Sequence, residues 1–190
     1  AEAVTNPIGL GRAIGTWVRL VRNAGGGLVR HAAYLMEAVS LRRQAKADGI
    51  AHIHAHFSTN AAAVALLCHR LGGPGYSFTA HGPDEFIDWG RSSMALKVAE
   101  ARFVAAISQY CRVQLTLAAG MAHRDKIHIV RCGLDLSEFP PSKAGFDASA
   151  PFVCVGRLCP QKAQVLIVEA TARVVRSHPQ VKVRLIGDGE

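Results

Sequence analysis

PFVCVGRLCPQK, residues 151–162, joins a short apolar run to the start of a helical pattern. The run from Pro151 to Val155 is typical of a buried parallel strand, and residues 162–177 repeat apolar side chains with a helical period. The loop between them should therefore lie at the carboxyl end of a strand, the edge where open α/β sheets bind ligands. Free N–H groups and the positive end of the helix dipole favour an anion at that edge.

Two cations in this loop point to the same kind of ligand. Arg157 offers a planar fork of donors suited to phosphate oxygens, whereas Lys162 offers a mobile point charge. The pair therefore predicts a site for a diphosphate. The alternative is two solvated surface cations, because Arg and Lys are usually exposed.

The composition indicates a globular protein with an anionic partner. The chain has 190 residues, of which 49% are hydrophobic, so that it can bury a sizeable core. Its formal net charge of +8 favours a nucleotide, a nucleic acid or a lipid surface as partner. No apolar run is long enough to predict a membrane span. The first residues show no signal-peptide pattern and no starting Met, so we expect the chain to begin inside a longer protein.

The cysteines indicate a reducing compartment. Their number is odd, they are scattered, and none forms a CxxC pair. This usage fits free thiols better than a disulfide framework and predicts a cytoplasmic setting. The five residues are Cys68, Cys111, Cys132, Cys154 and Cys159.

Arginines are interleaved with apolar and aromatic residues over the first 50 positions. Such a basic amphipathic stretch can dock on anionic lipid headgroups. It can equally be a pair of helices packed on a sheet with solvated arginines. Nucleic-acid binding fits less well, because only 6% of residues are aromatic and no zinc spacing is present.

Apolar runs alternate with helical patterns along the chain, which predicts an α/β fold with parallel sheets. Gly49 suits the left-handed cap that ends a helix, and Ser58 or Thr59 could cap the start of the next one. The predicted strands cover residues 50–56, 76–80, 102–107, 127–131, 151–155 and 182–186. The predicted helices cover residues 8–23, 28–48, 59–71, 92–101, 109–119 and 162–177.

Turn-forming residues interrupt this alternation between residues 137 and 145, as in an interdomain linker. We therefore predict one domain over residues 1–140, a linker over residues 141–150 and a second domain from residue 151 to residue 190. Only a strand, a helix and a strand follow the linker, which is less than a usual domain. The second domain is expected to be cut short.

Three histidines alternate along the first predicted strand. His52, His54 and His56 share one face of that strand and could bind zinc. Against zinc, we expect this strand to be central and buried on both faces, with its side chains fanning apart and no acidic fourth ligand nearby. His56, nearest the carboxyl end, could instead reach a ligand cleft.

Five motifs in register resemble glycosyltransferase family 4. They are HIHAHF at residues 52–57, SFTAHGPD at 77–84, AAIS at 105–108, CGLD at 132–135 and GRLCPQK at 156–162. The resemblance runs from about residue 50 to residue 190. Within the family, the chain is most similar to bacterial enzymes that build exopolysaccharide and other surface glycans.

The resemblance implies the GT-B architecture, in which two Rossmann-like domains with parallel sheets face each other across a cleft; both would be incomplete in this chain. Enzymes of this family move a sugar from a nucleotide-diphosphate donor to an acceptor hydroxyl, retain the anomeric configuration and need no metal or other cofactor. The expected partners are a nucleotide sugar and a lipid-linked or glycan acceptor. The expected location is the cytoplasm, including the inner face of the plasma membrane.

The resemblance also implies roles for single residues. His81 stands where the family places a histidine beside the transferred sugar, and Gly156, Arg157 and Lys162 stand where it neutralises the donor diphosphate. Asp84 would hold its loop or touch the acceptor. Residues matching other turns of the family pattern near the cleft are Gly133 and Asp135, and Gly187 to Gly189.

The chain departs from the family pattern in four places. The family's first strand with its Gly-rich loop would precede residue 1, and its Glu-x7-Glu element would follow residue 190, so we expect the isolated piece to be inactive. Ala163 replaces the usual glycine after Lys162, and Arg131-Cys132 replaces a frequent Pro-Asn. Two alternatives stay open: a non-catalytic nucleotide or anion binder that uses Arg157 and Lys162, and a metal hydrolase built on the three histidines.

Overall fold

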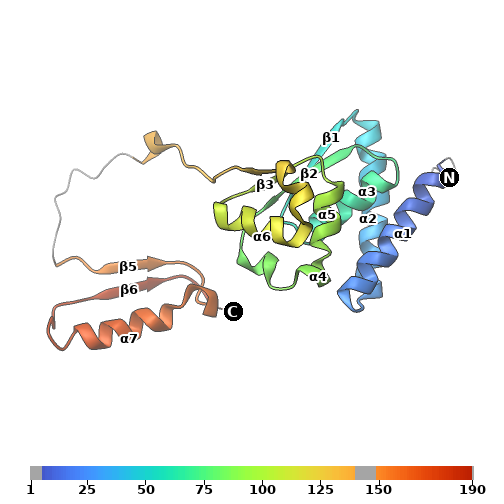
Figure 1. Ribbon diagram of the computed structural model, residues 1–190. Helices are drawn as coiled ribbons and strands as arrows, with labels where there is room; N and C mark the ends of the chain where they lie inside the picture. The colour runs from blue at the N-terminus through green and yellow to red at the C-terminus, as the bar shows by residue number, and fades with distance from the viewer. Residues whose placement is uncertain (1–5, 140–148, 190) are drawn as a thin grey trace. The chain divides into compact units, whose positions relative to one another are not determined.

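The protein, seen in a computed structural model, is described over residues 6–139 and 149–189. It divides into two compact units, Ala1–Leu134 and Asp135–Glu190. Each unit contains a parallel sheet (Figure 1). The predicted α/β class with parallel sheets is therefore confirmed. The linker predicted for residues 141–150 lies, up to residue 148, outside the described residues.

The first unit is built on a four-stranded sheet in which the order in space equals the order in the chain. All neighbouring strands are parallel, and residues His54 and Ser77 pair in the register of the first two. Helices connect the strands, as the alternating sequence pattern predicted. The strands are β1 (His52–His56), β2 (Gly75–Ala80), β3 (Val104–Ala106) and β4 (Ile127–Ile129), and the connecting helices are α3 (Asn60–Arg70), α5 (Met94–Glu100) and α6 (Gln109–Ala119).

One face of this sheet packs against α3, α5 and α6 and forms the core. Side chains along β2 point alternately to the two faces of the sheet. Those of Tyr76, Phe78 and Ala80 point to the helix side, where they are fully buried in this core. Ser77 and Thr79 point to the opposite side, towards the histidines of β1. The two faces of the sheet therefore differ in chemistry: one is apolar and the other carries histidines and hydroxyls.

The expectation that the first strand is central and buried on both faces is wrong. Among the described strands β1 lies at the edge of the sheet, and His54 and His56 are exposed. Only the alternate residues Ile53 and Ala55 contribute to the core. Three histidines in five positions made the strand half polar, which is the pattern of a strand with a single apolar face.

Two long helices precede the sheet, α1 (Pro7–Ala24) and α2 (Leu28–Ala47), and both pack against α3. Asn6 caps α1 by accepting a hydrogen bond from the Gly9 N–H at 2.9 Å. The Trp17 indole donates to the His31 carbonyl at 2.7 Å and joins the two helices. The reading as a packed helix pair is correct for their inner faces, which pack on α3 and, at Ile53, on β1 of the sheet.

No helix within residues 6–139 and 149–189 combines the length and apolar character that a membrane span needs.

Of the two predicted helix caps, the one at Gly49 is present and the one at Ser58 or Thr59 is not. Gly49 follows α2 with a φ of 66°, as predicted for a left-handed cap. Thr59 occupies the N-cap position of α3, but its side chain makes no capping bond and instead donates to Asn60 Oδ1 at 2.9 Å. Ser58 is fully buried, and its hydroxyl has no hydrogen-bond partner among the described residues. The prediction of a side-chain cap from Ser58 or Thr59 is therefore wrong.

The helix predicted over residues 92–101 is divided. Ser93 adopts a left-handed conformation with a φ of 55° and separates α4 (Trp89–Ser92) from α5. Short 3-10 helices lie in several of the remaining connections. They are η2 (Pro83–Phe86), η3 (Met121–Lys126) and, at the start of the second unit, η4 (Leu136–Glu138).

The second unit is a strand, a helix and a parallel strand. It consists of β5 (Phe152–Val155), η5 (Pro160–Lys162), α7 (Gln164–Val174) and β6 (Val183–Ile186). The helix begins two residues later than predicted, because Ala163 adopts a left-handed φ of 53° and interrupts the turn. This is the position where the family pattern has glycine, the residue that adopts this conformation without strain.

Candidate active site

Two histidines meet where β1 and β2 end. His56 is the last residue of β1 and His81 is the first residue after β2, so both lie at the carboxyl edge of the sheet. Their rings are joined by a hydrogen bond of 3.0 Å between His56 Nδ1 and His81 Nε2. One of the two nitrogens donates the proton of this bond and the other accepts it. The sequence predicted both residues for a ligand site, and the fold places them in contact.

Phe57 completes this cluster with a strained backbone. It has a φ of 71°, although it is not a glycine, and its N–H donates to the Thr79 carbonyl at 2.9 Å. Its ring lies 4.6 Å from that of His81, centroid to centroid. The left-handed conformation costs about 1 kcal/mol, and strain of this kind is concentrated at functional sites. The strained residue therefore marks the same edge of the sheet as His56 and His81.

A buried carboxylate fixes the backbone beneath the cluster. Glu85 accepts hydrogen bonds from the N–H groups of His81 and Gly82 through one oxygen and from the Ser58 N–H through the other. Its side chain is only 6% exposed. One residue of η2 thus holds both the loop after β1 and the loop after β2, and so determines where His81 lies.

A buried lysine supports the same loop from the other side. The Lys97 ammonium donates to the carbonyls of Ser58 at 2.6 Å and Thr59 at 2.8 Å. Burial lowers the pKa of Lys97 to about 8, and the nearby Glu85 charge opposes that effect. Sequence reasoning missed both residues. The only signal for Lys97 was a lysine inside the apolar segment MALKVA, residues 94–99.

The remaining histidines form a ladder with hydroxyls on the exposed face of the sheet. His54 bonds Ser77 Oγ through Nδ1 at 2.6 Å and Thr79 Oγ1 through Nε2 at 2.8 Å, and His52 reaches the same Ser77 oxygen at 2.8 Å. Partial burial, with smaller repulsions from His56, His52 and His81, lowers the pKa of His54. Both ring nitrogens of His54 are thus engaged by hydroxyl groups.

This ladder does not favour the metal-hydrolase alternative. A zinc ligand needs a free ring nitrogen directed at the metal, and His54 has none to offer. Within the described parts of the chain, no group of three His, Cys, Asp or Glu side chains is arranged to hold a metal ion.

Three further predicted residues lie in 3-10 helices and connecting segments. Asp84 is exposed in η2, next to the buried Glu85. Gly133 is exposed in the segment after β4. Asp135 is the N-cap of η4, where its carboxylate accepts from the Ser137 hydroxyl at 2.6 Å and the Ser137 N–H at 2.9 Å. These two bonds lower the pKa of Asp135. Its observed role is to form a turn.

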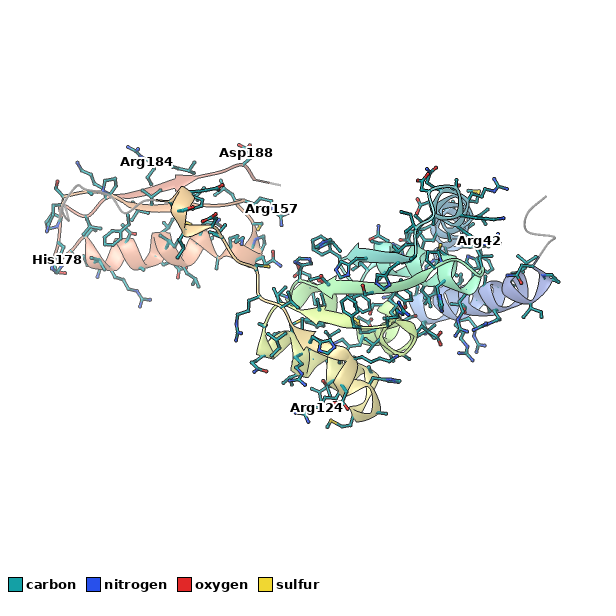
Figure 2. All side chains as sticks on the ribbon, turned by 90° about the horizontal axis from the view of Figure 1, so that it is seen from above. Arg42, Arg124, Arg157, His178, Arg184 and Asp188 are labelled. Atoms are coloured by element: carbon teal, nitrogen blue, oxygen red, sulfur yellow. The ribbon has the colours of Figure 1, made fainter. Side chains whose placement is uncertain are left out.

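The second unit brings its two candidate loops together. The loop after β5, with Gly156 and Arg157, lies against the loop after β6, because the Leu158 N–H donates to the Asp188 carbonyl at 2.7 Å. Figure 2 shows Arg157 and Asp188 at one end of this unit and His178 at the other. Both loops follow the carboxyl ends of parallel strands, which is the edge predicted for an anion.

Glycine permits this approach. A Cβ atom on Gly187 would lie 2.1 Å from the Gly156 carbonyl oxygen, so no other residue fits there. Gly189 forms an isolated bridge with Leu158 and would tolerate a Cβ at 3.6 Å. Gln164 donates to the Arg157 carbonyl at 2.7 Å and fixes the loop to the first turn of α7. Lys162 ends η5 and is exposed.

The comparisons with known proteins agree with these motifs. A search of curated proteins found no match. A family model described as Glycosyltransferase Family 4 matches residues 6–138. This match covers well over half of the chain and includes α1 and α2, which the sequence motifs did not reach. The chain therefore belongs to glycosyltransferase family 4.

Proposed function

We propose that this glycosyltransferase moves a sugar from a nucleotide-diphosphate sugar to an acceptor hydroxyl with retention of the anomeric configuration. The observation that carries the proposal is the placement of His81 at the carboxyl edge of β2. Its backbone is held by the buried Glu85, and its ring contacts those of His56 and Phe57. A histidine fixed in this way can orient a sugar or stabilise charge that develops on it.

In the first unit, His81 is the proposed catalytic residue, and His56 positions its ring through their shared proton. The bond from the anomeric carbon to the diphosphate oxygen breaks, and its electron pair stays on the departing nucleoside diphosphate. The acceptor oxygen forms the new bond to the anomeric carbon, and its proton passes to the departing diphosphate oxygen. Charge on the sugar is largest during this exchange, which is when a fixed imidazole beside it is most useful.

In the second unit, the proposed diphosphate site consists of Gly156, Arg157 and Lys162. Negative charge accumulates on the diphosphate as it leaves, and two cations at a helix N-terminus stabilise that charge. The same cations supply the role that a divalent metal has in other transferases, so the proposed reaction needs no metal or other cofactor. The adjacent loop with Gly187 and Gly189 keeps the backbone of this site in place.

We also propose a role in bacterial polysaccharide or glycolipid synthesis, with a lipid-linked or glycan acceptor, in the cytoplasm and on the inner face of the plasma membrane. The outward face of α1 supports membrane contact. It exposes the apolar residues Ile14 and Val18 beside the cations Arg12, Arg19 and Arg22.

The test is sugar transfer by the full-length protein from a panel of UDP-, GDP- and ADP-sugars in the presence of EDTA. We expect transfer that persists in EDTA and gives a product with the donor's anomeric configuration by NMR. An Arg157→Gln, Lys162→Gln variant should lose transfer, whereas an Arg173→Gln, Arg176→Gln variant, with the same charge change on exposed positions, should retain it.

Nucleotide binding that depends on Arg157 and Lys162 but leads to no turnover would replace this proposal with the non-catalytic binder. A product with inverted anomeric configuration would contradict the retaining mechanism but not the proposed sugar transfer.

A further inference from the structure

The two histidines at the carboxyl edge of the first sheet also have the arrangement of two metal ligands. His56 Nδ1 and His81 Nε2 lie 3.0 Å apart, and neither atom has another hydrogen-bond partner among the described residues. His56 is exposed and His81 is half-buried, so an ion with its own water ligands can reach the space between them. Imidazole nitrogen is the commonest metal ligand in proteins.

The separation of these two nitrogens fits a shared ion. Zinc binds imidazole nitrogen at about 2.0–2.1 Å in a tetrahedral arrangement, which places two ligand nitrogens about 3.3 Å apart. The observed distance of 3.0 Å is close to this value, and a small rotation of the exposed His56 side chain supplies the difference. A single ion can therefore take the place of the proton between the two rings.

Binding of the ion moves a proton within the pair and removes none from two neutral rings. In the hydrogen bond, one ring donates its N–H and the other accepts with a lone pair. The donor ring must carry its proton on the opposite nitrogen before both facing nitrogens can bind a metal. The opposite nitrogens, His56 Nε2 and His81 Nδ1, have no hydrogen-bond partner in the described parts of the chain, so either can hold that proton.

The fold fixes the backbone segments that carry the two rings. Glu85 accepts from the His81 N–H through one oxygen and from the Ser58 N–H through the other, so one carboxylate ties the two loops together. The Phe57 N–H donates to the Thr79 carbonyl at 2.9 Å, which joins the end of β1 to β2. Ligands that are held in place beforehand lose less entropy when the ion binds.

The other histidines of β1 take no part in this pair. Both ring nitrogens of His54 are held by the hydroxyls of Ser77 and Thr79, and His52 bonds to the same Ser77 oxygen. The described chain therefore supplies two ligands to the ion, and water completes its coordination shell. Such a site binds an ion more weakly than a structural zinc site with four protein ligands, and it lacks the three protein ligands of a catalytic zinc site.

We propose that His56 and His81 chelate a divalent transition metal such as zinc, with water as the remaining ligands. Imidazole suits Zn²⁺, Ni²⁺ and Cu²⁺, whereas Mg²⁺ prefers oxygen ligands, so the pair should bind the first three ions and not Mg²⁺. On the proposed function, on which this step alone rests, a metal on His81 blocks the ring that stands beside the transferred sugar. Zinc should then inhibit sugar transfer, and EDTA should restore it.

Zinc chloride is the probe that tests the pair. It is titrated into the full chain labelled with ¹⁵N, and the ring nitrogens of the histidines are followed by NMR. We expect His56 Nδ1 and His81 Nε2 to shift together along one saturation curve, whereas magnesium chloride should shift neither.

Substitution of either ring should remove the chelate. His56→Gln and His81→Gln should each weaken zinc binding at least about tenfold. The second variant keeps the backbone N–H that Glu85 binds, so the loop should stay in place, which circular dichroism and unfolding in urea verify. His128→Gln is the control, because it removes an exposed imidazole from β4 of the same sheet; it should leave zinc binding within about twofold.

A variant that lacks both rings distinguishes a chelate from two independent ligands. Because a chelate is lost when either ring is removed, the double variant should bind zinc within about twofold of each single variant. Additive losses would overturn the proposal, and so would an equal loss in His128→Gln or zinc shifts confined to other side chains. The binding assay involves no turnover, so the metal site can stand if sugar transfer fails, and can fall if transfer succeeds.

Discussion

At the scale of single residues, Glu85 has the largest influence on the candidate active site. It is buried, and its two oxygens accept three backbone N–H groups from two different loops. Backbone groups that lose a buried acceptor cannot be solvated without opening the structure. The position of His81 therefore depends on a residue that need not touch the substrate.

Glu85→Gln should lower the free energy of unfolding by about 2 kcal/mol. The neutral amide has one acceptor oxygen in place of two, and the hydrogen bonds that remain are no longer strengthened by a negative charge. Urea unfolding followed by circular dichroism measures the change. Glu37→Gln, at an exposed position on α2, is the control and should alter stability by less than about 0.5 kcal/mol. Equal effects of the two substitutions would contradict the anchoring role.

Lys97→Met should change how stability depends on pH. Burial lowers the pKa of Lys97 from 10.5 to about 8 in the folded chain, so the unfolded chain binds this proton more tightly. The free energy of unfolding therefore rises as the pH increases from about 8 towards 10.5. The contribution of Lys97 to this rise is on the order of 3 kcal/mol. The methionine variant lacks that rise.

Urea unfolding of both proteins across this pH window gives the difference. Burial raises the pKa values of Cys68 and Cys111 to about 11, which lowers stability at high pH, but both thiols are present in both proteins and cancel. A difference that stays constant over the window would show that Lys97 keeps its ordinary pKa.

The sequence predicted residues with a recognisable chemistry and missed those that act through burial. His56 and His81 stood at the ends of predicted strands, and the fold brings their rings to hydrogen-bonding distance. Glu85 and Lys97 looked like surface charges, because nothing in one sequence shows that a carboxylate will lie beneath two loops. Their partners are backbone groups, which have no sequence signature.

At the scale of elements, the pair of loops in the second unit depends on one glycine. Gly187→Ala would place its Cβ 2.1 Å from the Gly156 carbonyl oxygen, at a φ of 150° that other residues rarely adopt. The loops should separate, and binding of nucleoside diphosphates should fall by at least about tenfold, measured by isothermal titration.

Gly189→Ala is the matched control in the same loop, since its Cβ would find ordinary contacts at 3.6 Å and more. It should bind nucleoside diphosphates nearly as the unchanged protein does. If Gly187→Ala binds equally well, the approach of the two loops has no part in the anion site.

The elements themselves were largely predictable, whereas their ends and neighbours were not. All six predicted strands exist, and the helix over residues 109–119 has the predicted bounds. The left-handed residues Ser93 and Ala163 shifted two helix starts, and neither is a glycine that would have signalled the break. The edge position of β1 depends on strand order, which hydrophobic periodicity does not encode.

At the scale of the whole molecule, the net charge of +8 predicts salt-sensitive contact with anionic surfaces. The protein should sediment with vesicles that contain phosphatidylglycerol and be released as salt rises, because each basic residue near the surface contributes about 1 kcal/mol that salt screens. Replacing Arg12, Arg19 and Arg22 together by glutamine should abolish most of this binding.

The control replaces Arg124, Arg173 and Arg176, which lie outside the basic N-terminal stretch, and should retain more binding than the α1 variant. Equal losses would mean that net charge and not the α1 face determines contact with the vesicle.

The sheet of the first unit has one further consequence, which concerns synthesis. Each strand pairs with the strand that precedes it in the chain, so the spatial order is β1, β2, β3, β4. Among the strands that the structure describes in this unit, none pairs with a strand from a distant part of the sequence. The growing polypeptide can therefore build this sheet one strand at a time as it leaves the ribosome. Each newly exposed sheet edge then pairs with the next strand to emerge.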